Sequence, residues 1–158
     1  MIEVKIDLSE HADLIKRFDG AETVIREEAT IFVNRMTTAG SNIAKDLVGK
    51  KTHTLERSIT ALPATWAGGT VTGAWGTNVP YARMHEEGTD PHVIFPKRAK
   101  ALRWMVGGKA VFARRVNHPG TKPRLYMKGS MDRIERGLSS NGETLKARIV
   151  SRLSQGGA

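Results

Sequence analysis

The chain has 158 residues, 39% of them hydrophobic and 26% charged, a composition that fits one domain built around one core. Because it contains no cysteine and no apolar run near the roughly 18 residues that span a bilayer, it excludes disulfides, zinc–thiolate and iron–sulfur sites and a membrane-spanning helix. The net charge of +9 is local, since ten of the 25 basic residues and none of the 16 acidic ones lie between positions 91 and 131.

The N-terminal segment alternates apolar and charged residues over 1–8, which predicts a strand with one buried face. Ser9 is a suitable N-cap for a short helical turn that ends near Phe18, and Asp19-Gly20 is typical of a turn. This segment lacks the apolar core of a signal peptide, so we expect a protein that is made and used without secretion.

The segment from Ala21 to Val48 predicts one long helix, on the order of 40 Å at about 1.5 Å per residue. Gly40-Ser41 is a candidate bend, and Gly49 is placed to end the helix. The apolar positions recur every three or four residues and form one continuous stripe: Ile25, Ala29, Phe32, Met36, Ala39, Ile43 and Leu47.

The remaining segments alternate between short strands and helices. Strands over 55–63 and 66–76 are expected to pair around Gly68-Gly69, and a short helical turn follows over 81–87. Strands over 93–95, 101–106 and 109–116 come next, with Gly107-Gly108 as a second reversal. Basic residues interrupt both faces of these last strands, so they predict a protruding arm rather than a core. Two amphipathic helices are expected at the end, over 127–138 and 143–153, separated by 139–142.

Together these patterns predict an α+β fold: a small antiparallel sheet packed by one long helix, with a protruding basic β-hairpin arm and C-terminal helices. We expect a single domain over 1–158, in which 91–123 forms the extended arm.

Catalytic and metal-binding patterns are weak. His85 and His92 with Glu86 or Glu87 could hold a metal, but their spacing matches no ligand pattern and Pro91 would break a shared helix. The sequence has no HExxH, no GxSxG and no glycine-rich nucleotide loop. Histidines beside proline, such as His92 and His118, are interpreted as turn residues bonded to nearby backbone. We therefore predict no catalytic residue, no metal and no cofactor.

The basic segment is the one candidate site. It could contact the phosphates of DNA, with an aromatic ring available for stacking, or its charge could meet acidic groups on a partner protein. We favour the protein interface, and the two roles can coexist. The candidate residues are Lys97, Arg98, Lys100, Arg103, Trp104, Lys109, Arg114, Arg115, His118, Lys122 and Arg124.

Several motifs in this segment resemble the tail-component family of tailed bacteriophages, whose members act at the head–tail joint as neck or tail-completion proteins. The resemblance covers roughly residues 20–135, and its most specific part is His118-Pro119-Gly120-Thr121 after the second Gly-Gly reversal. The family ordinarily continues with a Pro-Phe pair after Lys122-Pro123, where this chain has Arg124-Leu125-Tyr126. Other shared elements are Tyr81-Ala82, Glu87-Gly88-Thr89, Lys100-Ala101-Leu102-Arg103-Trp104 and Phe112-Ala113.

The resemblance implies a structural virion protein without enzymatic activity, made in the bacterial cytoplasm. It would form a homo-oligomeric ring between the head-closure or connector proteins and the tail tube, with packaged DNA as a further possible contact of the basic arm. A tail terminator that stops tube polymerisation is the nearest alternative. A nucleic-acid-binding protein acting alone is an alternative of another class, and a metal-dependent nuclease using His85, His92 or His118 comes third.

Overall fold

A computed structural model describes residues 12–49 and 53–155, so the strand expected over 1–8 lies outside the described residues. The fold is α+β, as predicted, and contains three separate two-stranded antiparallel sheets. Its elements follow in this order: α1 (Ala12–Leu47), α2 (Thr54–Ser58), β1 (Thr60–Ala67), β2 (Thr70–Gly76), α3 (Ala82–Glu87), β3 (His92–Ile94), β4 (Leu102–Val106), β5 (Lys109–Ala113), β6 (Val116–His118) and α4 (Tyr126–Gln155).

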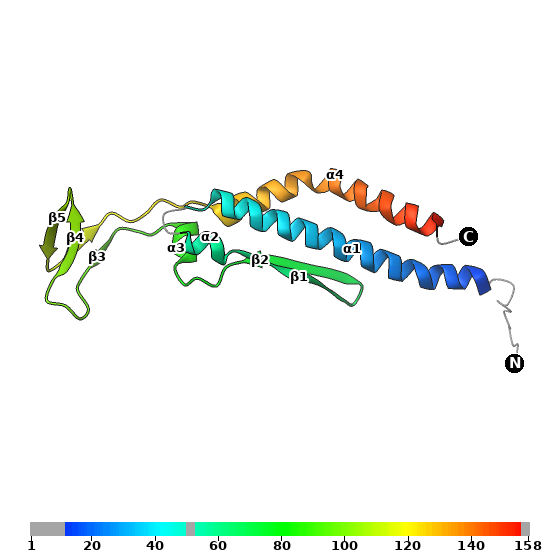
Figure 1. Cartoon of the computed structure of the whole chain (residues 1–158), viewed down its shortest axis with the longest axis horizontal. Helices are drawn as coiled ribbons and strands as arrows, with labels where there is room; N and C mark the ends of the chain where they lie inside the picture. The colour runs from blue at the N-terminus through cyan, green and yellow to red at the C-terminus, as the bar shows by residue number, and fades with distance from the viewer. Residues whose placement is uncertain (1–11, 50–52, 156–158) are drawn as a thin grey trace, which may run out of the picture.

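Helix α1 lies between two layers (Figure 1). Helix α4 runs antiparallel along one side of it, and the β1–β2 hairpin covers another side. Strands β3 to β6 form the arm, which extends away from this helical body, with β4–β5 at its far end. The molecule is therefore elongated: its accessible surface is 12406 Å², whereas a compact chain of this mass would expose about 7,800 Å².

The predicted long helix is confirmed, but it begins earlier than expected. Asp19-Gly20 continues the helix instead of turning, and a single glycine lowers helix stability by only about 1 kcal/mol. Gly40 has a packing role: a Cβ there would lie 2.8 Å from Cε2 of Trp75, so the indole can approach the helix only at glycine. The most buried positions form a line beside the predicted stripe and include polar residues: Glu28, Thr37, Ser41, Ala44 and Val48.

The predicted hairpin around Gly68-Gly69 is confirmed, and both glycines have positive φ (55° and 79°), as a tight two-residue turn requires. Its first strand begins only at Thr60, because 54–58 form α2 instead of the expected strand. Trp66 belongs to this first strand and pairs with Val71. The half-buried positions of this hairpin combine large residues such as Trp66 and Trp75 with small ones such as Gly73. The sheet lies closest to α1 at Gly73, where a Cβ would meet side chains of that helix.

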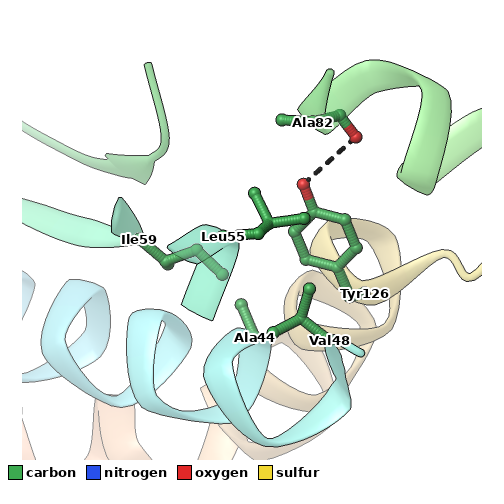
Figure 2. Close-up of a cluster of buried hydrophobic side chains, with 6 residues drawn as sticks. All are labelled: Ala44, Val48, Leu55, Ile59, Ala82 and Tyr126. Carbon is green, nitrogen blue, oxygen red and sulfur yellow. Dashed lines mark hydrogen bonds between the residues drawn. The ribbon is translucent and has the colours of Figure 1, made fainter. Parts of the chain in front are cut away.

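The core is small and lies where α2, α3 and the start of α4 meet the end of α1 nearest the arm (Figure 1), and its side chains are drawn in Figure 2. Residues from α1, the α2 region, α3 and the start of α4 meet there, and Tyr126 is its largest side chain, 1% exposed. The Tyr126 hydroxyl donates to the carbonyl of Ala82 at 3.3 Å. Burial, followed by the nearby charge of Glu86, raises the pKa of Tyr126 above its ordinary value. The buried apolar residues are Ala44, Val48, Leu55, Ile59, Ala82 and Tyr126.

The C-terminal region is one helix, so the two helices predicted there are wrong. The expected break at 139–142 lies inside α4. Asn141 is half-buried and its Nδ2 lies 3.7 Å from the Met36 sulfur on α1. Packing along α1 thus overrides the weak helix preference of the Ser-Ser-Asn-Gly run.

An ionic cluster joins the middle of α1 to the C-terminal part of α4. Arg148 Nε donates to Glu28 at 2.7 Å, and Arg152 donates to Glu28 at 3.1 Å and to Glu27 at 2.9 Å. The Glu28 side chain is only 3% exposed. The bond from Arg148 is the main cause that lowers the pKa of Glu28, and the bond and charge of Arg152 act in the same direction against burial.

Candidate assembly and nucleic-acid interface

The arm leaves the body at a matched pair of Gly-Thr dipeptides. Thr89 and Thr121 exchange two backbone hydrogen bonds of 3.0 Å, and their hydroxyls lie 3.1 Å apart. Gly88 and Gly120, which precede them, have φ of 78° and 83°, and a Cβ on either would collide with the facing threonine's carbonyl oxygen. This geometry explains why Gly88-Thr89 and Gly120-Thr121 are both needed at the arm base.

The next ladder pairs β3 with β6 and stacks two histidines. His92 and His118 are register partners, with ring centroids 5.0 Å apart. His92 Nδ1 lies 2.8 Å from the carbonyl of Asp90, and His118 Nδ1 accepts the Gly120 N–H at 3.1 Å. The predicted bonding of both histidines to local backbone is confirmed, but they are strand residues of β3 and β6 and not turn residues.

The β4–β5 hairpin at the far end has a continuous apolar face. Its register, set by Gly107-Gly108, places Leu102 opposite Ala113, Trp104 opposite Val111 and Val106 opposite Lys109. Successive residues of a strand point to opposite faces, so these three pairs share one face on which Lys109 is the only charge. The expectation that basic residues interrupt both faces is confirmed only in part: each face carries one basic residue, Lys109 on this face and Arg103 on the other, and the remaining positions of the paired strands are apolar.

The second face of the hairpin is also largely apolar. It carries the pairs Arg103–Phe112 and Met105–Ala110. Met105, Val106 and Phe112 are 58%, 57% and 64% exposed. A two-stranded hairpin with large apolar side chains exposed on both faces is marginally stable in water by itself. We call residues 102–113 the hairpin tip.

Five cations gather between the two ladders of the arm. The pair Ile94–Val116 lies on one side of them and the pair Leu102–Ala113 on the other. All five are exposed, and none has an ion pair within the described part of the chain. We call them the basic collar: Lys97, Arg98, Lys100, Arg114 and Arg115.

The other predicted site residues lie elsewhere. Arg103, Trp104 and Lys109 are in the hairpin tip, and His118 is in the stacked pair. Lys122 and Arg124 lie beyond the arm base, on the body side. They line a surface hollow of about 550 Å³ with Tyr81, Met84, His85, Thr89, Thr121 and Pro123. The predicted residues are thus divided among four places (the basic collar, the hairpin tip, the stacked pair and the hollow) and do not form one surface.

Glu86, considered above as a metal-site residue, has a structural role. Its two carboxylate oxygens accept the N–H groups of Met127 and Lys128 at 2.9 Å each, and so cap the start of α4. His85 contacts the Tyr81 ring, with centroids 5.7 Å apart. Within residues 12–49 and 53–155, no group of three or more His, Asp or Glu is arranged to hold a metal ion.

Sequence reasoning missed two features of this surface. The hairpin faces could have been found, because the predicted Gly107-Gly108 turn already sets which residues face each other. The cap that α3 supplies to α4 had no sequence signal, since Leu125, which precedes the helix, has no capping side chain and a positive φ of 50°.

Comparisons with known proteins add no identification: no family model matches the chain, and neither the curated proteins nor the solved structures include a match. Among the described helices, none combines the length and apolar character needed to cross a membrane.

Proposed function

We propose that this protein is a structural component of the head–tail joint of a tailed bacteriophage, a neck or tail-completion protein. It would assemble as a homo-oligomeric ring that connects the head-closure or connector proteins to the tail tube. The observation that carries the proposal is the hairpin tip, an apolar β-ribbon held away from the body by the arm (Figure 1).

The exposed surface supports an assembling protein. The accessible area of 12406 Å² exceeds the area of about 7,800 Å² expected for a compact chain. Large apolar side chains in the tip contribute to this excess, and protein interfaces are enriched in such Trp, Phe and Met side chains. A neighbouring subunit that covers both faces of the tip would supply the stabilisation that the isolated ribbon lacks.

The resemblance to the tail-component family gives the particular role. Its most specific element, His118-Pro119-Gly120-Thr121, has a physical purpose here, because it pairs with Gly88-Thr89 and starts the arm. The residues behind the resemblance thus build the feature that an assembling subunit would present to its neighbours.

A loop replacement tests the proposal. Residues 95–115 are replaced by Asn-Gly, a favoured two-residue turn, joining Ile94 to Val116, which are already ladder partners. The shortened chain should remain folded and monomeric in light scattering after size-exclusion chromatography, while the full chain forms rings visible by negative-stain microscopy. A second variant, Trp104→Ser with Phe112→Ser, should give the same result. Rings from either variant, or a full chain that stays monomeric, would contradict the proposal.

A further inference from the structure

We propose that the basic collar binds the phosphodiester backbone of a nucleic acid duplex, independently of its base sequence. This inference rests on the proposed function for its setting, but it concerns a different part of the arm from the hairpin tip that is proposed to hold the ring together.

The collar concentrates unneutralised charge. Residues 95–101 on one strand and 114–115 on the other lie between two ladder pairs, Ile94–Val116 and Leu102–Ala113. Those pairs keep the two strands together, so the three cations of the first segment and the two of the second share one short section of the arm. Every acidic residue of the chain lies outside 91–131.

The described part of a second copy offers the collar few free carboxylates. Most carboxylates of the described body are already engaged: Glu27 and Glu28 with the arginines of α4, Glu87 with Arg83, Glu86 with the start of α4. Glu143 lies 3.9 Å from Lys146, and Glu56 contacts His53. The described acids without such a contact are dispersed over α1, the segment after α3, and α4: Glu22, Asp90, Asp132 and Glu135.

The chemistry of the collar also differs from that of a protein-interface centre. Such centres are enriched in aromatic residues and arginine and depleted in lysine. The collar has two lysines and three arginines, and its segment 97–101 adds only alanines and no aromatic residue. The apolar anchors are in the hairpin tip. Exposed Lys and Arg side chains without fixed partners suit the evenly spaced charges of a phosphate backbone, which positions a protein without reading bases.

The salt dependence of DNA binding measures the number of contacts. Five cations that each neutralise a phosphate give a slope of log K against log salt of about −4.5, so affinity falls about 500-fold between 50 and 200 mM salt. The probe is a fluorescent random-sequence DNA duplex, and the protein is the Trp104→Ser, Phe112→Ser variant, so that each particle carries one collar. A second duplex of unrelated sequence should bind equally well.

Matched charge variants locate the contact. In the collar variant, Lys97, Arg98, Lys100, Arg114 and Arg115 become Gln. In the control variant, five exposed cations of the body become Gln: Arg57, Lys128, Arg133, Arg136 and Lys146. Each removes five charges from the net +9. The collar variant should lose almost the whole salt slope, and the control variant should keep it.

Several outcomes would overturn the proposal: no binding of the duplex at 50 mM salt, equal losses in the two charge variants, or a strong preference for one DNA sequence. Poly-glutamate that competes as well as unlabelled DNA would also overturn it, and would indicate an acidic protein as partner. The collar variant should still form rings in the otherwise native chain. DNA binding without rings would contradict only the proposed function. Rings without DNA binding would contradict only the proposed role of the collar.

Discussion

The body and the arm are stabilised in different ways. In the body, α1 packs against both α4 and the β1–β2 hairpin. The buried side chains of the body have defined partners: Tyr126 bonds to Ala82, and Glu28 bonds to Arg148. In the arm, paired backbones and two glycine-dependent turns maintain the shape, while the side chains of the tip are exposed. The difference teaches that the body is a folding unit, whereas the surface of the arm is available to a partner. Substitutions should therefore affect stability in the body and association in the arm.

The largest effect is expected at the body core. Tyr126→Ala removes an almost fully buried ring and its hydrogen bond to Ala82, and should lower the free energy of unfolding by about 3–5 kcal/mol. Urea denaturation followed by circular dichroism measures this. Tyr126→Phe keeps the ring and should cost much less, about 1 kcal/mol. Equal losses of unfolding free energy in the two variants would mean that burial of the ring does not stabilise the core.

A smaller effect is expected where the β1–β2 hairpin meets α1. A Cβ at Gly73 would lie 2.5 Å from Cγ1 of Val33 and 2.8 Å from Cγ2 of Thr37. Gly73→Ala should therefore lower the free energy of unfolding by about 1–3 kcal/mol through overpacking. Gly76→Ala is the matched control, because nothing lies within 4 Å of a Cβ there. If the control were the more damaging change, the packing described for this layer would be incorrect.

The third prediction concerns the ionic cluster between the middle of α1 and the C-terminal part of α4. The pKa of Glu28 is lowered from its usual 4.5, first by the hydrogen bond from Arg148. A carboxylate with a lowered folded-state pKa stabilises the fold above its unfolded pKa, and this contribution is lost as the pH falls through the folded value. Below about pH 4.5, the native chain should lose stability more steeply than Glu28→Gln does. Thermal melts over this pH range measure the effect. The control Glu22→Gln should lose stability with falling pH as steeply as the native chain does.

The smallest effect on stability is expected in the arm. Phe112 is 64% exposed, so Phe112→Ser should change the free energy of unfolding of the monomer by less than about 0.5 kcal/mol. The measurement is urea denaturation in the Trp104→Ser background, in which we expect no assembly. A loss comparable to that of Tyr126→Ala would show that the tip packs on its own body and does not face a partner.

Much of this architecture follows from local sequence. Helical spacing from Ala21 to Val48 predicted α1 from position 21 to its C-terminal end. Gly68-Gly69 and Gly107-Gly108 predicted two hairpins, because glycine adopts the positive φ that both turn positions need. The backbone role of His92 and His118 was also predicted from the adjacent prolines and is confirmed.

Tertiary contacts decided the rest. The Ser139–Gly142 run is locally a poor helix former, yet α4 continues through it because α1 provides a surface along its length. Glu86 caps a helix that begins forty residues later, a distance over which no local pattern operates. The basic residues were visible in the sequence as one window. Only the register of two ladders separated them into a collar and an apolar tip, because cross-strand neighbours are far apart in the chain and meet only when the backbones pair.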